Sequence, residues 1–140
     1  MRKEFICLLD ELVKPVSYLL DMHSWQRPMV ILLTGEMGAG KTTFTSHLVA
    51  ALGSQDVHSP TFTLINEYPL SQGSVFHFDL YRLQEEEELE ELGFEDIWGV
   101  QGLSIIEWWQ IAQNYLPPGC IEVSLEILDE ERRKIVVVQP

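Results

Sequence analysis

Residues 35–43, with the sequence GEMGAGKTT, have the residue types and spacing of a phosphate-binding loop. They match the pattern G-x-x-x-x-G-K-[ST] at every fixed position. Gly35, Gly38 and Gly40 allow the backbone to approach phosphate groups closely. The N–H groups of the loop and of the helix that follows it would then face the anion.

Two residues at the end of this loop supply the polar chemistry. Lys41 is placed to reach the β- and γ-phosphates, and the Thr42 hydroxyl is placed to bind Mg²⁺. The flanking sequence agrees, because residues 28–34 form an apolar run of strand type and residues 44–53 have helical spacing with a terminal glycine. A strand, a glycine-rich loop and a helix in this order predict a site for the phosphates of a nucleotide.

Two acidic residues are candidates for the metal partner that such a loop needs. Asp79 follows the apolar segment VFHF, and Glu107 follows LSII. If both strands run parallel to the strand before the loop, their carboxyl ends lie on the same edge of the sheet as the loop. Each acid could then bind Mg²⁺, hold it through water, or orient the attacking water. The alternative for each is a cap on the helix that follows it.

Other polar residues near these acids have open roles. His77 lies two residues before Asp79 on the same face of a strand, so it could be catalytic, bind a metal, or be packed and hydrogen-bonded. Arg82 could contact phosphate or a partner, or form a structural ion pair. Ser59 and Thr61 could sense the γ-phosphate as a switch segment, or belong to a plain Ser-Pro turn.

The elements that must position these residues alternate between strands and helices. Strands are expected at 28–34, 59–68, 74–83, 103–107, 120–128 and 135–140, and residues 5–9 form a strand or the start of a helix. Helices are expected from Pro15 to near 23, and at 44–53, 84–92 and 108–116. The pattern predicts an α/β fold with a P-loop NTPase-like mixed β-sheet flanked by helices, parallel around the phosphate loop and with antiparallel hairpin additions.

Length and composition limit the possible classes of protein. With 140 residues, of which 46% are apolar, the chain is expected to form a single domain over residues 1–140. The formal net charge of −13 disfavours direct binding of nucleic acid, which requires lysine and arginine at the phosphates. Cys7 and Cys120 form no CxxC motif, and no apolar run approaches the length of a membrane span. We therefore expect a reduced, cytoplasmic protein without a membrane segment.

Six glutamates crowd residues 84–92. This segment is expected to be a helix held to the body by Leu83, Leu89 and Leu92. Its acidic side is interpreted as a solvated face, with a docking surface for a basic partner as the alternative.

Four sequence blocks stand in order along the chain: GEMGAGKTT, SPTF, HFDLYRL and IIEW. Together they resemble the bacterial TsaE (YjeE) family, small ATPases needed for threonylcarbamoyl modification of adenosine 37 in tRNA. The resemblance extends from about Lys14 to the final strand. It implies a compact phosphate-loop fold, weak ATP hydrolysis that depends on Mg²⁺, and partnership with TsaD and TsaB. In that picture the protein regulates or resets the TsaD–TsaB complex and meets tRNA only indirectly.

The resemblance also implies roles for individual residues. Gly38, Ala39, Gly40, Lys41, Thr42 and Thr43 would hold the nucleotide phosphates, Thr42 and Glu107 would bind Mg²⁺, and Asp79 would be the acid required for hydrolysis. Trp108 would pack near the nucleotide, and Arg132 falls where the family often has an arginine in its last hairpin. The chain departs from the family at Met37, where leucine is more common, and at Lys14-Pro15, where we expect a threonine. Trp109 has no assigned role.

Two other functions remain open from the residues alone. A small P-loop kinase would share the fold, but it would need an acceptor pocket and usually an arginine-rich lid, which the nine lysines and arginines do not supply. A non-enzymatic nucleotide switch would bind nucleotide without useful hydrolysis. The preference for ATP over GTP rests on the resemblance and on the lack of an N/T-K-x-D guanine motif.

Overall fold

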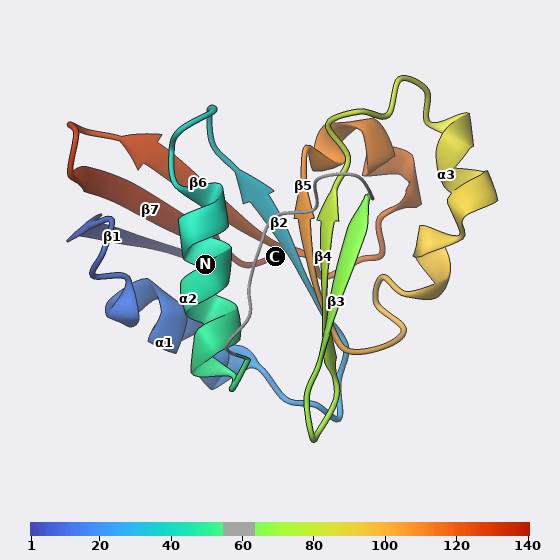
Figure 1. The fold of residues 1–140 in the computed structure, drawn as a ribbon, viewed down its shortest axis with the longest axis horizontal. Helices are drawn as coiled ribbons and strands as arrows, with labels where there is room; N and C mark the ends of the chain where they lie inside the picture. Colours follow the sequence, from blue (N-terminus) through green and yellow to red (C-terminus); the bar gives the residue numbers. More distant parts are fainter. Residues whose placement is uncertain (55–63) are drawn as a thin grey trace.

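The computed structural model describes residues 1–54 and 64–140 of the chain (Figure 1). Within these residues, seven strands form one sheet in the order β1-β7-β6-β2-β5-β4-β3. The strands are β1 (Arg2–Leu8), β2 (Met29–Thr34), β3 (Ile65–Pro69), β4 (Ser74–Asp79), β5 (Leu103–Glu107), β6 (Ile121–Ile127) and β7 (Arg132–Val138). The helices are α1 (Val13–Met22), α2 (Lys41–Ala51) and α3 (Glu87–Leu92), with 3₁₀ segments η1 (Phe94–Asp96) and η2 (Trp109–Tyr115).

The middle of the sheet is parallel and its margins are antiparallel. β2 pairs in parallel with β5 and β6, and β5 pairs in parallel with β4. The hairpins β3–β4 and β6–β7 are antiparallel, and β1 pairs antiparallel with β7 along its whole length. The predicted mixed sheet is therefore confirmed, and residues 5–8 belong to strand β1, which ends before Leu9. Because β2, β5 and β4 run in the same direction, their carboxyl ends meet at one edge.

Two apolar layers cover the sheet on opposite faces. In Figure 1, α1 and α2 lie beside β1, β7 and β6, whereas α3 lies beyond β4 and β3 on the other side. β2 contributes to both layers: Ile31 and Leu33 pack with α1 and α2, while Val30 and Leu32 pack with the cluster that contains Phe78. A strand buried on both faces needs a continuous apolar run, which explains the sequence MVILL.

Several element boundaries differ from the sequence-based expectation. The segment expected to be a helix at 108–116 is instead the 3₁₀ segment η2. Trp108, directly before η2, has a left-handed backbone (φ 56°) and therefore cannot be part of a regular helix. The strand expected to reach residue 83 ends at Asp79, whose carboxylate accepts the Tyr81 N–H and turns the chain. Leu92, expected to anchor α3, is 44% exposed because Gly93 turns the chain immediately after it.

Other expectations can be compared directly with the structure. α1 begins two residues before Pro15, which its first turn tolerates because N–H groups there have no intrahelical partner. Residues 55–63, which include the first part of the strand expected at 59–68, lie outside the described residues. In the part of the chain that is described, no helix is long and apolar enough to span a membrane. Cys7 and Cys120 are both free thiols.

Candidate functional site

The phosphate loop connects β2 to α2 and has the backbone that its glycines predict. Gly38 and Gly40 have φ angles of 85° and 104°, which side chains with a Cβ rarely adopt. A Cβ on Gly40 would also lie 2.4 Å from Leu9 Cδ1, so Leu9 closes against the loop from the end of β1. Ala39, between Gly38 and Gly40, is fully buried. The loop is thus a tight turn supported from behind by the rest of the fold.

Lys41, the first residue of α2, extends its ammonium along the cavity at the edge of the sheet. Its Nζ donates to the Gly35 carbonyl at 2.8 Å and lies 3.9 Å from Glu107 Oε1. The same atom lies 4.2 Å from the centre of the Trp108 ring, close enough for a cation–π contact. These contacts hold the ammonium beside the loop, where the phosphates of a nucleotide would lie.

Glu107, the last residue of β5, is a buried carboxylate with two different neighbours. Its Oε2 is hydrogen-bonded to His77 Nε2 at 2.5 Å, and its Oε1 faces Lys41. Glu107 is 4% exposed and His77 is fully buried. A buried carboxylate is strongly unfavourable unless it is paired, so these contacts stabilise Glu107 in its position. Of the alternatives for His77, the structure shows a packed, hydrogen-bonded residue behind Glu107.

Asp79 lies directly beside Glu107, as the parallel register of β4 and β5 requires. Its Oδ1 accepts the Tyr81 N–H at 3.1 Å and closes a local turn, but it caps no helix, because α3 begins only at Glu87. The same side chain also lines the cavity that holds Lys41 and Glu107. The expected alternative of a helix cap is therefore wrong for Asp79, whose carboxylate closes a turn and lines the cavity in one conformation.

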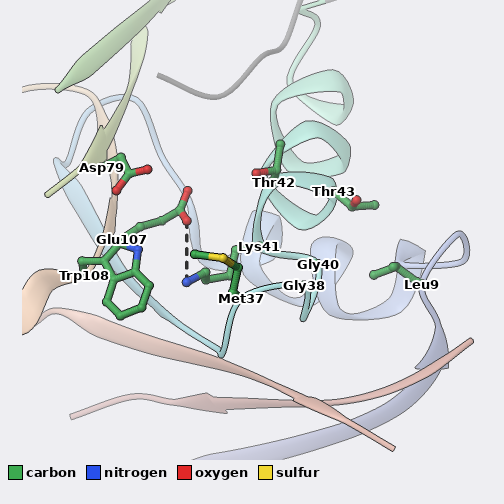
Figure 2. A pocket seen from close by; sticks show the side chains of 10 residues that line it. All are labelled: Leu9, Met37, Gly38, Gly40, Lys41, Thr42, Thr43, Asp79, Glu107 and Trp108. Carbon is green, nitrogen blue, oxygen red and sulfur yellow. Dashed lines mark ion pairs between the residues drawn. The ribbon is translucent and has the colours of Figure 1, made fainter. Parts of the chain in front are cut away.

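The residues at the ends of β4 and β5 and at the start of α2 share one cavity of about 380 Å³. Figure 2 shows the ammonium of Lys41 and the carboxylate of Glu107 facing each other, with Asp79 on one side and Thr42 on the other. The described residues that line the cavity are Leu9, Met37, Gly38, Gly40, Lys41, Thr42, Thr43, Asp79, Glu107 and Trp108. A hydroxyl and two carboxylates are the hard oxygen ligands that Mg²⁺ prefers, so this donor set fits the expected metal.

A second cavity of about 430 Å³ adjoins the first and shares Leu9 and Thr43 with it. It lies between the end of β1, helix α2 and the β6–β7 turn. Its lining residues are Leu8, Leu9, Asp10, Thr43, His47, Glu130 and Glu131.

The two tryptophans after Glu107 have separate contacts. Trp108 covers Lys41 and also stacks at a tilt against Tyr81, with ring centres 5.1 Å apart. Trp109, which had no assigned role, donates from Nε1 to Thr34 Oγ1 at 2.9 Å. Since Thr34 directly precedes the phosphate loop, Trp109 ties η2 to the entry of the loop.

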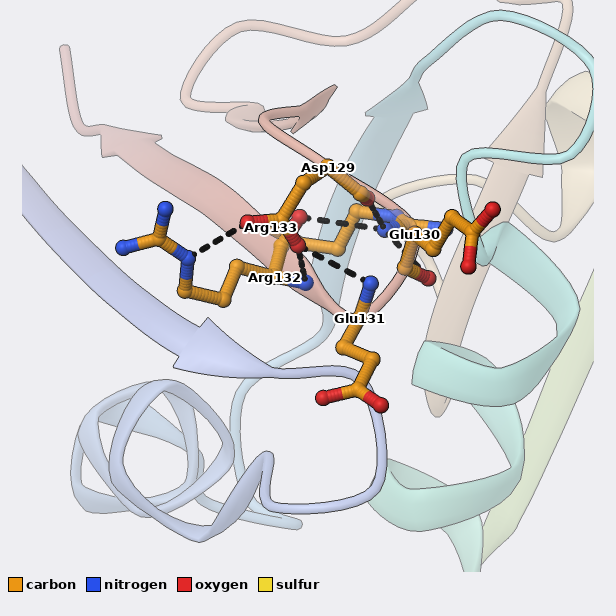
Figure 3. Close-up of polar contacts among 5 residues, drawn as sticks. All are labelled: Asp129, Glu130, Glu131, Arg132 and Arg133. Atoms are coloured by element: carbon orange, nitrogen blue, oxygen red, sulfur yellow. Dashed lines mark hydrogen bonds and ion pairs between the residues drawn. The ribbon is translucent and has the colours of Figure 1, made fainter.

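The remaining predicted residues lie elsewhere. Arg82 is exposed beyond β4, and neither it nor Arg132 is among the described residues that line the first cavity. Arg132 pairs with Asp129 at 2.7 Å across its own turn (Figure 3), and its hydrogen bonds lower the pKa of the Asp129 carboxyl to about 2. Ser59 and Thr61 fall within residues 55–63, outside the described residues.

Sequence reasoning missed one buried cation close to the loop. Arg133, which lies between the strands expected at 120–128 and 135–140, is the second residue of β7 and is 5% exposed. It donates to the carbonyl groups of Gly38 and Ala39. The alternation of side chains along a strand could have revealed that Arg133 is buried, because Arg133 lies on the same face of β7 as the core residues Ile135 and Val137.

The family model described as "Threonylcarbamoyl adenosine biosynthesis protein TsaE" matches residues 11–135 of the chain. A relative from Haemophilus influenzae, "tRNA threonylcarbamoyladenosine biosynthesis protein TsaE", is 38% identical over 127 residues, which cover 90% of this chain and 80% of that protein. A relative of the same name from Rickettsia felis is 41% identical over 112 residues, covering 78% of this chain and 64% of that protein.

A solved structure agrees with these sequence matches. The crystal structure of YdiB from Bacillus subtilis superimposes with a TM-score of 0.74 at 25% sequence identity. The match covers 98% of this chain and 84% of the YdiB chain.

The hydrogen bond between His77 and Glu107 predicts strong energetic coupling. We expect a double-mutant cycle of His77→Ala and Glu107→Ala, measured by urea unfolding, to give a coupling energy of about 1 kcal/mol or more, because each single variant leaves a buried polar partner unsatisfied. The exposed pair Tyr115 and Glu90, joined at 2.9 Å, serves as the control and should couple far more weakly. Additive effects at His77 and Glu107 would contradict the role given to His77.

Proposed function

Because the chain belongs to the TsaE family of threonylcarbamoyl adenosine biosynthesis proteins, we propose that it is a Mg²⁺-dependent ATPase subunit required for the t6A37 modification of tRNA. The observation that carries this proposal is the meeting of Lys41, Thr42, Asp79 and Glu107 at one cavity beside the phosphate loop. These residues come from the ends of β4 and β5 and from the start of α2. A loop alone would support phosphate binding, whereas the two added carboxylates support hydrolysis.

Lys41 and the loop would bind the phosphates. Residues from Gly38 to Thr43 would present backbone N–H groups, except Ala39, whose N–H donates to the Glu36 carbonyl at 3.0 Å. The N-terminus of α2 also favours an anion. The Lys41 ammonium already lies at the loop, and its contact with Glu107 is long at 3.9 Å. A phosphate oxygen can therefore replace Glu107 as its nearest anion while the carboxylate remains hydrogen-bonded to His77.

Thr42 and Glu107 would hold Mg²⁺, which when bound neutralises charge that develops on the phosphates during hydrolysis. No group of three or more His, Cys, Asp or Glu among the described residues is gathered as a metal site. This fits a Mg²⁺ that takes few protein ligands and completes its shell with phosphate oxygens and water. His77 supports this role by fixing the orientation of the Glu107 carboxylate.

Asp79 would act on the attacking water. Its Oδ1 is held by the Tyr81 N–H, which leaves the carboxylate facing the cavity beside Glu107. The water oxygen bonds to the γ-phosphorus, the bond from that phosphorus to the bridging oxygen breaks, and Asp79 orients the water or accepts its proton. The nucleoside end of ATP would extend past Thr43 into the second cavity, which adjoins the phosphates.

The ATPase cycle would serve a partner rather than act on tRNA directly. The net charge of −13 would repel the RNA backbone, so contact with tRNA is better made by another protein. We infer that the partners are TsaD and TsaB, and that nucleotide binding and hydrolysis regulate or reset their complex. A location in the cytoplasm follows from this role.

Three substitutions test the proposed roles. We expect Lys41→Ala to weaken ATP binding and hydrolysis together, because the ammonium contacts the phosphates. Asp79→Asn should slow hydrolysis by about 100-fold or more with ATP affinity nearly unchanged. Glu107→Gln should raise the Mg²⁺ concentration that hydrolysis needs. Phosphate release and calorimetric binding are the measurements, and Glu95→Gln on the exposed surface is the charge-matched control. Hydrolysis by Asp79→Asn at the wild-type rate would show that the mechanism is wrong.

The partner assignment predicts that TsaD and TsaB retain the protein in a pull-down, more strongly in one nucleotide state than in the other. Turnover should rise when the pair is added, because an accessory ATPase acts within its complex. Lys41→Ala, which should not respond to nucleotide, is the control. Failure to bind with and without ATP would refute the partnership. Binding that follows nucleotide state without any stimulated turnover would favour a pure switch.

A further inference from the structure

Arg133 is a buried cation next to the turn of the β6–β7 hairpin. It follows Arg132, but neighbouring residues of a strand point to opposite faces, and Figure 3 shows the two side chains diverging. Arg132 lies on the surface, whereas Arg133 passes beneath the turn. There its Nη1 donates to the carbonyl groups of Asp129 at 2.7 Å, Arg132 at 3.0 Å and Glu130 at 3.4 Å.

The other side of the same guanidinium contacts the phosphate loop. Nε donates to the Ala39 carbonyl at 2.9 Å, and Nη2 lies 3.4 Å from the Gly38 carbonyl. Gly38 and Ala39 are more than 90 residues away in sequence. Among the described residues, no carboxylate lies within ion-pair distance of Arg133, so carbonyl groups of the turn and of the loop solvate its charge. Arg133 therefore connects the last hairpin directly to the back of the loop.

These contacts determine which way the loop presents its donors. A peptide group is planar and trans, so its carbonyl and its N–H point in opposite directions. The Ala39 carbonyl is held on Arg133, behind the loop, and the Gly40 N–H of the same peptide group must point away from Arg133. Gly40 itself lines the cavity together with Lys41 and Thr42. A flip of this peptide would instead turn a carbonyl oxygen toward the phosphates.

Arg133 also contributes positive charge to a protein that has few basic residues. The chain has 9 basic and 22 acidic residues, and a nucleotide brings further negative charge. A guanidinium that is 5% exposed is poorly screened by solvent, so its field acts on the loop. Lys41 in front of the loop and Arg133 behind it would then attract the same anion from two sides.

We propose that Arg133 is a positioning residue for nucleotide binding: it holds the phosphate loop in the conformation that directs the Gly40 N–H into the cavity. The inference rests on the proposed nucleotide site and adds to it a residue of the last hairpin. It also makes the turn at residues 129–131 mechanically connected to the loop, since one side chain bonds to both.

The test compares Arg133→Met with Lys134→Met, which removes the same charge from the next residue of β7. Lys134 pairs with Glu4 at 2.9 Å on the opposite face and serves as the control. We expect Arg133→Met to weaken ADP binding, measured by calorimetry, by about tenfold or more. It should also shift the Gly40 amide resonance in the nucleotide-free protein. Lys134→Met should change neither the ADP affinity nor the Gly40 resonance. If Arg133 contributed to stability alone, Arg133→Met would lower the unfolding temperature without moving the Gly40 resonance.

The outcomes separate this inference from the proposed function. If wild-type protein bound no nucleotide, the proposed function and this inference would both fail. If wild-type protein bound ADP and folded Arg133→Met bound it within twofold, only the inference would fail. Should Arg133→Met not fold, Arg133→Lys replaces it, because one ammonium cannot bridge the turn and the loop. Several-fold weaker ADP binding by Arg133→Lys would support the inference, and wild-type affinity would overturn it.

Discussion

The arrangement of the site depends on one buried carboxylate, Glu107, held between His77 and Lys41. An ionised carboxylate in the interior is stable only with partners in good geometry. His77 comes from β4 and Lys41 from α2, so both elements must lie in register with the end of β5. The same register brings Asp79 beside Glu107. The left-handed backbone at Trp108 then places an indole ring over the Lys41 ammonium.

The charges around the phosphate loop differ from those of the protein as a whole. A net charge of −13 disfavours any anion, whereas the proposed ligand of the loop is a polyphosphate. Its local environment is different, because the N-terminus of α2, Lys41 and Arg133 all lie around residues 38–41. Leu9 and Trp109 fix the loop by packing and by a hydrogen bond to Thr34. The fold thus brings two basic side chains and a helix N-terminus together around the loop of a chain that is acidic overall.

Local patterns were enough to predict the fold and the gathering of Lys41, Asp79 and Glu107 at one edge of the sheet, but not the contacts between them. The loop motif and the apolar runs before Asp79 and Glu107 indicated parallel strands with a shared edge, and the register of β4 with β5 agrees. The roles of Trp109 and Arg133 were missed because each bonds to a residue 75 or more positions away. The 3₁₀ segment after Trp108 depends on one residue with positive φ, which helical spacing cannot reveal. His77 became interpretable only once its buried partner was known.

We infer that Thr42 and Glu107 hold one metal that arrives with the nucleotide, and that Asp79 lies beside it. Paramagnetic broadening by Mn²⁺, substituted for Mg²⁺ in isotope-labelled protein with ADP, would locate this metal. We expect loss of signal that requires the nucleotide and is centred on Thr42, Asp79 and Glu107. Broadening centred instead on the acidic residues of α3, with no dependence on nucleotide, would contradict this inference.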